Sequence, residues 1–380
     1  MENYNLLDVN IGDENVGRLA VYQRRLVAFE YAESWLNNGF AISPFSLPLQ
    51  KKLFIPKYDP FDGVYGVFSD SLPDGWGRLL VDRVLVKENK NPHEVDMLNR
   101  LAIVGDSGMG ALTYFPHHKW ESELAELEYD RIADECRRIL EAEYSDNLDE
   151  LFLLGGSSGG ARPKILIKID GEDWIVKFPS STDSRDIGEI EYRYSLCAKD
   201  CGVEMPETRL FSSKQCPGYF GAKRFDRICG EGKSTNRVHI ISASALLEVS
   251  HRVPSLDYNS LMQLTLELTK NYSEVEKMYR LMCFNVFAHN RDDHSNNFSF
   301  LYDNTQKVWK TAPAYDLTYS FSIGGEHATC INGNGRNPGM ADVLTVAEKI
   351  GIAKQKAKEI ADKVQRTVNE GLLDIIGNEK

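Results

Sequence analysis

Alternating apolar and polar residues characterise the start of the chain. Stretches 6–11, 17–21 and 25–31 show the period of two that is typical of half-buried strands, with glycine or Asp-Glu-Asn between them. From about residue 240 onward, apolar residues recur every three or four positions, which predicts helices instead. These helices cover 242–249, 258–270, 273–288, 341–350 and 353–372. The pattern therefore predicts an α+β fold with a β-rich first half and a helical second half.

The middle of the chain adds a second group of strands. Strands predicted at 165–169 and 174–178 flank Asp170-Gly171, a dipeptide typical of two-residue hairpin turns. A helix at 188–201 and a strand at 219–225 follow. We expect three parts: a β-rich subdomain over 1–120, a unit with a glycine-rich loop over 121–226, and a helical unit over 227–380.

Charge and composition exclude several classes of protein. The 380 residues include 44 Lys and Arg against 56 Asp and Glu, a net charge of −12, which disfavours binding of nucleic acid or anionic membranes by the whole surface. No apolar run approaches the roughly 18 residues of a membrane span, and the first residues lack the features of a secretory signal. Seven cysteines occur without a CxxC pair, which favours buried thiols over zinc or disulfides. We expect a cytoplasmic protein without membrane association.

A glycine-rich segment and a strand lysine are the first candidates for chemistry. Residues 155–160 read Gly-Gly-Ser-Ser-Gly-Gly, and Ala161-Arg162-Pro163-Lys164 follow. Lys177 lies in the next predicted strand but one, between two apolar residues. A glycine loop between strands and a lysine on a strand are the parts that cradle nucleotide phosphates in kinases. Each part alone is weak, because such a loop can be a simple turn and such a lysine can extend from an edge strand.

The strongest signal is the run His-Asn-Arg-Asp-Asp-His-Ser-Asn-Asn at 289–297. Phosphoryl transfer from ATP needs a carboxylate near the acceptor hydroxyl and oxygen ligands for Mg²⁺. Asp292 and Asn297 have the spacing D-x-x-x-x-N, and a predicted strand pair after them would return Asp316 to the same cleft. The order of glycine loop, strand lysine, helical half, D-x-x-x-x-N, hairpin and Asp predicts a protein-kinase-like two-lobe fold.

A metal site is the competing interpretation of this loop, because two His and two Asp fall within six residues. No HExxH motif and no cysteine partner accompany them, so a hydrolytic zinc site is disfavoured. We expect His294 to brace the loop or to contact phosphate.

The ordered motifs resemble the HipA-type serine/threonine kinases, the toxins of bacterial HipBA toxin–antitoxin modules, over nearly the whole chain. The matching runs are 70–76 (DSLPDGW), 104–111 (VGDSGMGA), 157–164 (SSGGARPK), 175–177 (IVK), 223–227 (KRFDR), the 289–297 loop and 313–316 (PAYD). The glycine–Ala-Arg-Pro-Lys run and the Arg-Phe-Asp-Arg run are specific to this family among kinase-like folds.

The resemblance implies roles for individual residues. Asp292 would be the catalytic aspartate, Asn297 and Asp316 the Mg²⁺ ligands, and Lys177 the contact to the ATP phosphates, with either Glu191 or Glu189 as its ion-pair partner. Residues 222–225 would receive adenine, and Lys223 stands where some members carry an acidic residue. The implied nucleotide-binding positions are Ser157, Ser158, Gly159, Gly160, Ala161, Lys177, Lys223, Phe225, His294, Asn297 and Asp316.

The resemblance also implies regulation and partners. Members phosphorylate a serine in their own glycine-rich loop, and Ser157 occupies that position. We expect a helix-turn-helix antitoxin as partner, operator DNA bound only through it, and a protein substrate, for which the family suggests aminoacyl-tRNA synthetases. A mainly non-catalytic co-repressor and a small-molecule phosphotransferase on the same scaffold are the alternatives.

Overall fold

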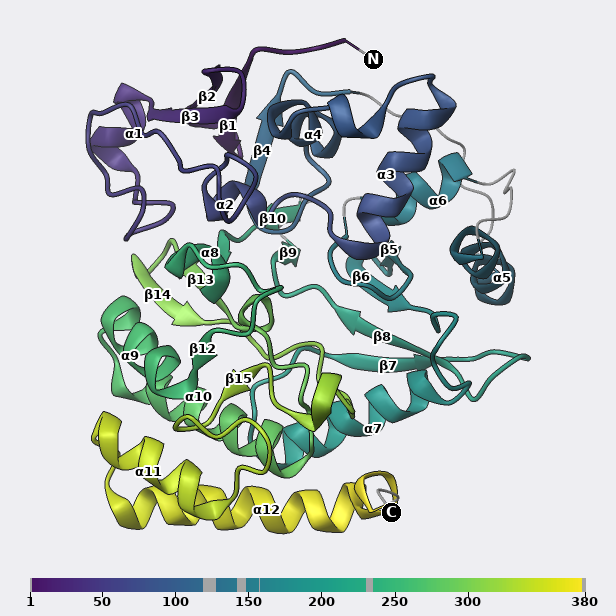
Figure 1. Cartoon of the computed structure of the whole chain (residues 1–380), viewed down its shortest axis with the longest axis vertical. Helices are drawn as coiled ribbons and strands as arrows, with labels where there is room; N and C mark the ends of the chain where they lie inside the picture. The colour runs from purple at the N-terminus through teal and green to yellow at the C-terminus, as the bar shows by residue number, and fades with distance from the viewer. Residues whose placement is uncertain (1, 119–127, 142–147, 157, 230–234, 378–380) are drawn as a thin grey trace. The chain divides into compact units, whose positions relative to one another are not determined.

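The computed structural model describes residues 2–118, 128–141, 148–156, 158–229 and 235–377 (Figure 1). The chain divides into two compact units, Met1–Gly188 with Leu210–Ile241 (unit 1) and Glu189–Arg209 with Ser242–Lys380 (unit 2). The predicted boundaries at 120 and 226 stay predictions. The α+β class is confirmed, because the chain combines two four-stranded sheets with helices, but the predicted β-rich first half is wrong, since helices hold more of its described residues than strands do.

Unit 1 begins with an antiparallel sheet in the order β3-β2-β1-β4. Its strands are β1 (Leu6–Ile11), β2 (Glu14–Tyr22), β3 (Leu26–Tyr31) and β4 (Leu112–Phe115). The predicted alternation is confirmed in β1, where Leu7 and Val9 are fully buried and their neighbours are not. Strand β4 pairs with β1 and so returns the chain to this sheet about a hundred residues later.

Helices then connect this sheet to a second one in unit 1. The helical elements are α1 (Glu33–Asn38), α2 (Gly66–Ser69), α3 (Gly75–Lys87), η1 (Pro92–Glu94), α4 (Met97–Val104), α5 (Tyr129–Leu140) and α6 (Leu148–Gly155). Helix α4 begins where Asp96 caps it, its carboxylate accepting a hydrogen bond from the Asn99 amide. Trp76 and Leu80 of α3 pack with Trp174 of the second sheet in one apolar core.

The second sheet has the order β5-β6-β8-β7. Its strands are β5 (Lys164–Ile169), β6 (Glu172–Lys177), β8 (Tyr219–Lys223) and β7 (Thr208–Phe211). The β5–β6 hairpin turns at Asp170 and Gly171, both with positive φ, as the sequence predicts for an Asp-Gly turn. A two-stranded ribbon follows, formed by β9 (Arg227–Cys229) and β10 (Thr235–Arg237), and the chain then continues into β11 (Ile240–Ser242).

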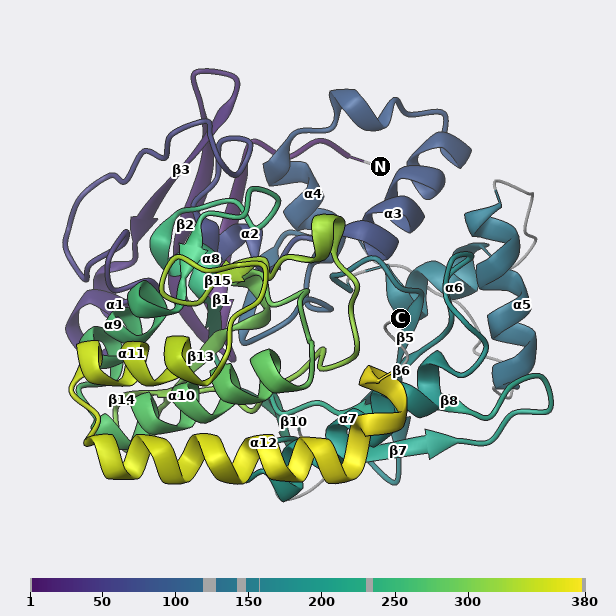
Figure 2. The same ribbon diagram turned by 60° about the horizontal axis from the view of Figure 1, so that its bottom comes forward.

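Unit 2 is mainly helical. Its helices are α7 (Ile187–Asp200), which starts just before the unit, α8 (Ala243–Leu247), α9 (Tyr258–Thr269), α10 (Tyr272–Phe287), α11 (Met340–Ile350) and α12 (Lys354–Ile376). Helix α12 packs along α10, and α11 contacts both α9 and α12 (Figure 2). No helix among the described residues is long and apolar enough to span a bilayer.

Short strands in unit 2 position the loops between these helices. Strands β13 (Ser299–Asp303) and β14 (Val308–Thr311) form an antiparallel hairpin. Strands β12 (Leu256–Asp257) and β15 (Thr329–Cys330) pair in parallel, and the turns η3 (Ser295–Asn297) and η4 (Ile323–Gly325) complete the described elements. The 289–297 loop joins α10 to β13, so the helix and the hairpin fix its two ends.

Candidate active site

The 289–297 loop places Asp292 at the surface and Asn297 beside it. The Asn297 side-chain amide donates a 2.7 Å hydrogen bond to the Asp292 carbonyl oxygen, which closes the loop across the predicted D-x-x-x-x-N spacing. This bond uses the Nδ2 group, so the amide oxygen of Asn297 stays available as an acceptor. Asp292 has an exposed side chain. The loop therefore presents a carboxylate and an amide oxygen, and both are suitable ligands or bases for phosphoryl chemistry.

Tyr315, the residue before Asp316, is bonded to the 289–297 loop. After the β13–β14 hairpin, the Tyr315 hydroxyl donates to the Asn296 carbonyl and shares a hydrogen bond with Ser299, both at 2.6 Å. Residue 316 thus follows a side chain that is tied to the residue before Asn297. Asp316 itself has φ +53°, a left-handed backbone that costs a non-glycine residue energy and is enriched at functional positions. An amide oxygen and a carboxylate held in this way fit the oxygen ligands that Mg²⁺ takes.

Several buried polar atoms of the loop have no partner in the described part of the chain. These atoms are Nδ1 of His294, Oδ1 of Asn290 and Oδ1 of Asn296. The His294 ring also lies 5.3 Å from the ring of His251. Because buried polar atoms in native proteins are nearly always satisfied, these three atoms point to a site that is completed by water or a ligand.

The two adjacent aspartates do not share a site. Asp292 is exposed, whereas the side chain of Asp293 is fully buried. The described residues contain no group of three or more His, Cys, Asp or Glu side chains that could hold a metal ion. The sequence singled out Asp293 only as a member of a possible zinc cluster, and the structure instead makes it the centre of a buried hydrogen-bond network.

In unit 1, the glycine-rich loop is seated on the start of helix α3. The Trp76 amide donates to the Gly160 carbonyl at 2.9 Å. A Cβ on Gly75 would collide with that same carbonyl, and a Cβ on Gly77 would collide with the carbonyl of Ser158. Gly75 and Gly77 are therefore needed because they lack a Cβ, which lets the start of α3 approach the backbone of the loop.

Side chains within the loop support its shape. The buried Ser158 hydroxyl donates to the Gly155 carbonyl at 2.5 Å, and Lys164 Nζ donates to the Gly159 carbonyl at 2.6 Å. Gly160 has φ +86°, and Ala161 is exposed. Ser157, the predicted autophosphorylation site, lies outside the described residues.

Lys177, at the end of β6, pairs in register with Lys164 of β5. Directly paired residues project from the same face of a sheet, and two like charges in such a pair destabilise it. Lys177 also lies over the ring of Phe220, 5.5 Å from its centre. Lys164 and Lys177 thus lie on one face of the sheet, beside the glycine-rich loop that Lys164 contacts.

The remaining predicted residues lie on three elements. Lys223 ends β8 and donates to Glu172, and the Phe225 side chain two residues later is half-buried. On α7, Glu191 is buried and Glu189 is exposed. Arg162 forms two hydrogen bonds with Asp183, at 3.0 and 3.2 Å, so its guanidinium is held at the edge of the loop.

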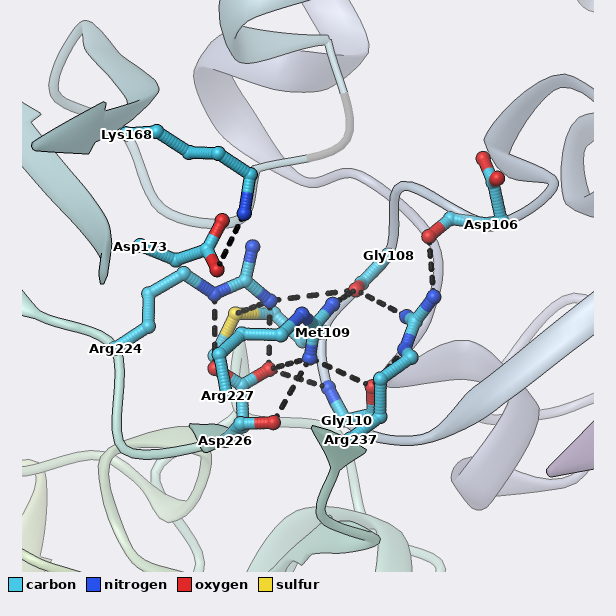
Figure 3. A network of polar contacts seen from close by, with 10 residues as sticks. All are labelled: Asp106, Gly108, Met109, Gly110, Lys168, Asp173, Arg224, Asp226, Arg227 and Arg237. Carbon is cyan, nitrogen blue, oxygen red and sulfur yellow. Dashed lines mark hydrogen bonds and ion pairs between the residues drawn. The ribbon is translucent and has the colours of Figure 1, made fainter. Parts of the chain in front are cut away.

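Three arginines hold the glycine motif at 105–110 (Figure 3). Arg237 donates to the carbonyls of Asp106, Gly108 and Gly110, the last two at 2.9 and 3.0 Å. Arg227 donates to the Gly108 carbonyl at 2.7 Å and to Gly110 at 2.9 Å. This motif is thus a set of backbone acceptors for guanidinium groups.

Asp226 is the single carboxylate at the centre of these arginines (Figure 3). Arg224 and Arg227 each approach its Oδ2 atom at 2.6 Å, and the Gly110 amide donates to the same oxygen at 2.9 Å. Burial raises the pKa of Asp226, but Arg224 and then Arg227 outweigh that effect, so its pKa lies below the usual range. We call Asp226, Arg224, Arg227 and Arg237 the Asp226 cluster, a structural clamp within unit 1.

Comparison with known proteins agrees with this architecture. The family profile of the HipA N-terminal domain matches residues 7–115, and that of the HipA-like C-terminal domain matches residues 156–372. A protein of Sinorhizobium fredii named "Putative kinase Y4mE" is 26% identical over 339 residues, which are 80% of this chain and 74% of that protein.

A solved structure with a similar fold is that of HipA from Shewanella oneidensis MR-1, in a complex of the toxin–antitoxin system with HipB and operator DNA. It has a TM-score of 0.73 and 18% sequence identity, and the match covers 97% of this chain and 90% of that one. The predicted fold is confirmed by this likeness. On the two family matches, which together span most of its length, the chain is a member of the HipA family.

Proposed function

We propose that this chain is an ATP-dependent protein serine/threonine kinase that acts as the toxin of a toxin–antitoxin system. The observation that carries the proposal is the hydrogen bond from Asn297 to the Asp292 carbonyl, in a loop to which Tyr315 ties Asp316. Membership of the HipA family and the kinase name of the relative from Sinorhizobium fredii support the same reaction class.

The residues have distinct roles in this proposal. Asp292, which is exposed, accepts the proton of the acceptor hydroxyl as the phosphoryl group is transferred. The Asn297 amide oxygen and the Asp316 carboxylate hold Mg²⁺, and Lys177 contacts the phosphates above the glycine loop. Mg²⁺, when bound, neutralises the charge that develops on the transferred group. The strand end at 222–225 receives the adenine.

The test is transfer of labelled phosphate from Mg²⁺-ATP by the purified chain. We expect Asp292→Asn to reduce the rate by about 10²–10⁴-fold, since a positioned base is lost. The melting temperature should stay within experimental error of the wild type, because the side chain is exposed. Wild-type turnover in this variant would contradict the kinase proposal.

Self-limitation by phosphorylation of Ser157 is a further part of the proposal. A phosphate adds about −1.5 to −2 charges beside the site of the ATP phosphates, and this should favour a rearranged loop with lower ATP affinity. Arg162 and Lys164 are the basic pair that follows Ser157, and pairing of Arg162 with the phosphate would compete with its ion pair to Asp183. Mass spectrometry after incubation with Mg²⁺-ATP should find phosphoserine 157 in the wild type and not in Asp292→Ala. An unmodified loop, or a modified and equally active protein, would contradict this part.

The proposed partner is a HipB-like helix-turn-helix antitoxin, by analogy with the complex described for the Shewanella oneidensis protein. With a net charge of −12, the chain should bind operator DNA only through a basic partner. A gel shift should require the antitoxin, and tight sequence-specific binding by the isolated chain would contradict this. Phosphoproteomes of cells expressing wild type or Asp292→Ala should identify the protein substrate, with aminoacyl-tRNA synthetases as the first candidates.

A further inference from the structure

Asp293 follows the proposed catalytic base and is a fully buried carboxylate whose two oxygens both accept hydrogen bonds. Its Oδ2 atom accepts from the Tyr258 hydroxyl at 2.9 Å and from His327 Nδ1 at 3.0 Å. Its Oδ1 atom accepts from the Thr329 amide at 3.1 Å, and its backbone carbonyl accepts from the Thr329 hydroxyl. We call these four residues the Asp293 cluster.

The donors of this cluster come from two distant parts of unit 2. Tyr258 starts helix α9, whereas His327 and Thr329 lie in the segment that follows Asp316. The backbone reinforces this connection, because the Ala328 amide donates to the Arg291 carbonyl at 3.0 Å. Three consecutive residues, His327, Ala328 and Thr329, are therefore hydrogen-bonded to the 289–297 loop.

A second chain of hydrogen bonds leads from the cluster back to the start of the loop. Asn285 donates to the Tyr258 hydroxyl at 2.9 Å, and Asn290 donates to the Asn285 side-chain oxygen at 3.0 Å. Tyr258, Asn285 and Asn290 are all buried. The loop is thus held at Asn290 and at Asp293, and Arg291 and Asp292 lie between these two fixed positions.

We propose that Asp293 is a positioning residue of the phosphoryl-transfer site. Its carboxylate fastens the 289–297 loop to the segment around His327 and Thr329, and this fixes the direction in which Asp292 presents its own carboxylate. The inference rests on the proposed kinase function. Nothing in the cluster requires Asp293 to touch a substrate, because its side chain is fully buried.

The chemistry explains why an aspartate is needed here. An ionised carboxylate only accepts hydrogen bonds, and here both of its oxygens accept from donors of three different residues. An asparagine has the same shape but replaces one acceptor by an N–H donor. That donor would face either the Thr329 amide, or the Tyr258 hydroxyl and His327 Nδ1. A buried donor facing a donor loses its hydrogen bond, so the fastening should fail without a change in volume.

The experiment compares Asp293→Asn with Glu274→Gln. Glu274 is a second buried carboxylate of unit 2, and it accepts from the Thr311 amide at 2.9 Å and from Lys277 at 3.0 Å. Its partners Thr311 and Lys277 lie outside the 289–297 loop, so this variant controls for the loss of a buried charge. The rate of labelled phosphate transfer from Mg²⁺-ATP to the chain itself and to water is measured against ATP concentration.

We expect Asp293→Asn to lower the maximal rate by about 10- to 100-fold with the half-saturating ATP concentration changed less than about threefold, since a small misplacement of a reacting group has this cost. Glu274→Gln should keep the wild-type maximal rate. An unchanged rate in Asp293→Asn, or an equal loss in both variants, would overturn the inference.

Two variants of His327 keep the test informative if Asp293→Asn does not fold. His327→Asn keeps an N–H donor near the position of Nδ1 and should retain most of the wild-type rate. His327→Leu removes the donor, and its rate should fall. Equal rates in the two variants would contradict a role that acts through this hydrogen bond.

Amide hydrogen exchange separates this inference from the proposed function. In Asp293→Asn, exchange should increase together at 289–297 and at 327–330, and Glu274→Gln should leave both segments protected. Unchanged protection of both segments in Asp293→Asn would overturn the fastening itself. If the wild type transferred no phosphate, the proposed function would be wrong, and the exchange data would still decide whether Asp293 joins the two segments.

Discussion

Asp226 in unit 1 and Asp293 in unit 2 are both buried carboxylates that bind a segment distant in sequence, but their partners differ. Asp226 is held by the cationic Arg224 and Arg227, which also bind the carbonyls of the 106–110 motif. Asp293 is held by a hydroxyl, an imidazole N–H and a backbone amide. The first cluster is an ion-pair clamp, and the second is a network of single, directional hydrogen bonds.

The difference indicates what each cluster does. Charged partners attract over a range of geometries. The Asp226 cluster therefore mainly stabilises the contact between the glycine motif at 105–110 and the β9–β10 ribbon. Directional bonds from several residues define orientation, which suits the loop that carries Asp292. We expect this contrast to appear in the free energy of unfolding.

The largest effect is expected for Arg224→Met. The substitution keeps much of the side-chain volume but leaves Asp226 Oδ1 without its 2.8 Å partner in the interior. Breaking a buried ion pair from one side costs about 3–5 kcal/mol. Urea unfolding followed by fluorescence should detect this loss, because Trp76 and Trp174 are buried in unit 1.

Arg18→Met is the matched control for this change. Arg18 pairs with Asp8 at 2.8 Å in the same unit, but its side chain is 66% exposed. An exposed pair contributes only about 0–1 kcal/mol, so the midpoint should hardly move. Similar losses in both variants would contradict the distinction between a clamp and a surface pair.

A smaller effect is expected for Tyr258→Phe in the Asp293 cluster. The change removes one donor to Asp293 and leaves the Asn285 amide without its acceptor, at a cost of about 1–3 kcal/mol. The free energy of unfolding from urea titration by circular dichroism measures this. Tyr272→Phe is the control, since its hydroxyl bonds the Ile350 carbonyl from a half-exposed ring. A greater loss in the control would contradict a special role for the buried network.

Acid should weaken the Asp226 cluster progressively. The folded pKa of Asp226 lies below its unfolded value of about 3.9, because Arg224 and Arg227 outweigh the effect of burial. Such a carboxyl stabilises the protein fully above the unfolded pKa, and this stability is lost as the pH falls through the folded pKa. The free energy of unfolding should therefore fall from about pH 5 downward. The slope should be smaller in Arg224→Met, and an identical slope would contradict the assignment.

The smallest effect is expected for Gly110→Ala. Gly110 has φ +71°, where an L-residue costs about 1–2 kcal/mol, and an added Cβ would lie 3.3 Å from the Ile240 amide nitrogen. Gly333→Ala in unit 2 provides the comparison, since Gly333 has φ +80° with open space around it. Thermal unfolding should show a slightly greater loss for Gly110→Ala. The reverse order would argue that the 106–110 motif tolerates change.

The glycine-rich loop at 155–160 shows what a local sequence pattern can predict and what it cannot. The 155–160 loop is identified from its composition, but its seat on α3 depends on the missing Cβ atoms of Gly75 and Gly77, eighty residues earlier. The run at 70–76 contains no local sign of the segment that packs against it. Likewise, strands β4, β12 and β15 have only two to four residues, which is too short to show the alternation of apolar and polar residues. They form because a partner strand is present to pair with.

The sequence by itself determined the elements with a repeating period, such as strands β1–β3 and helices α9, α10 and α12, and the D-x-x-x-x-N spacing of Asp292 and Asn297. These features are local, because periodicity and spacing are properties of neighbouring residues. Only the tertiary structure decided between Asp292 and Asp293, two identical side chains in one irregular loop. The first is exposed and the second is buried, because the donors that compensate a buried carboxylate, Tyr258, His327 and Thr329, lie about 35 residues away on either side.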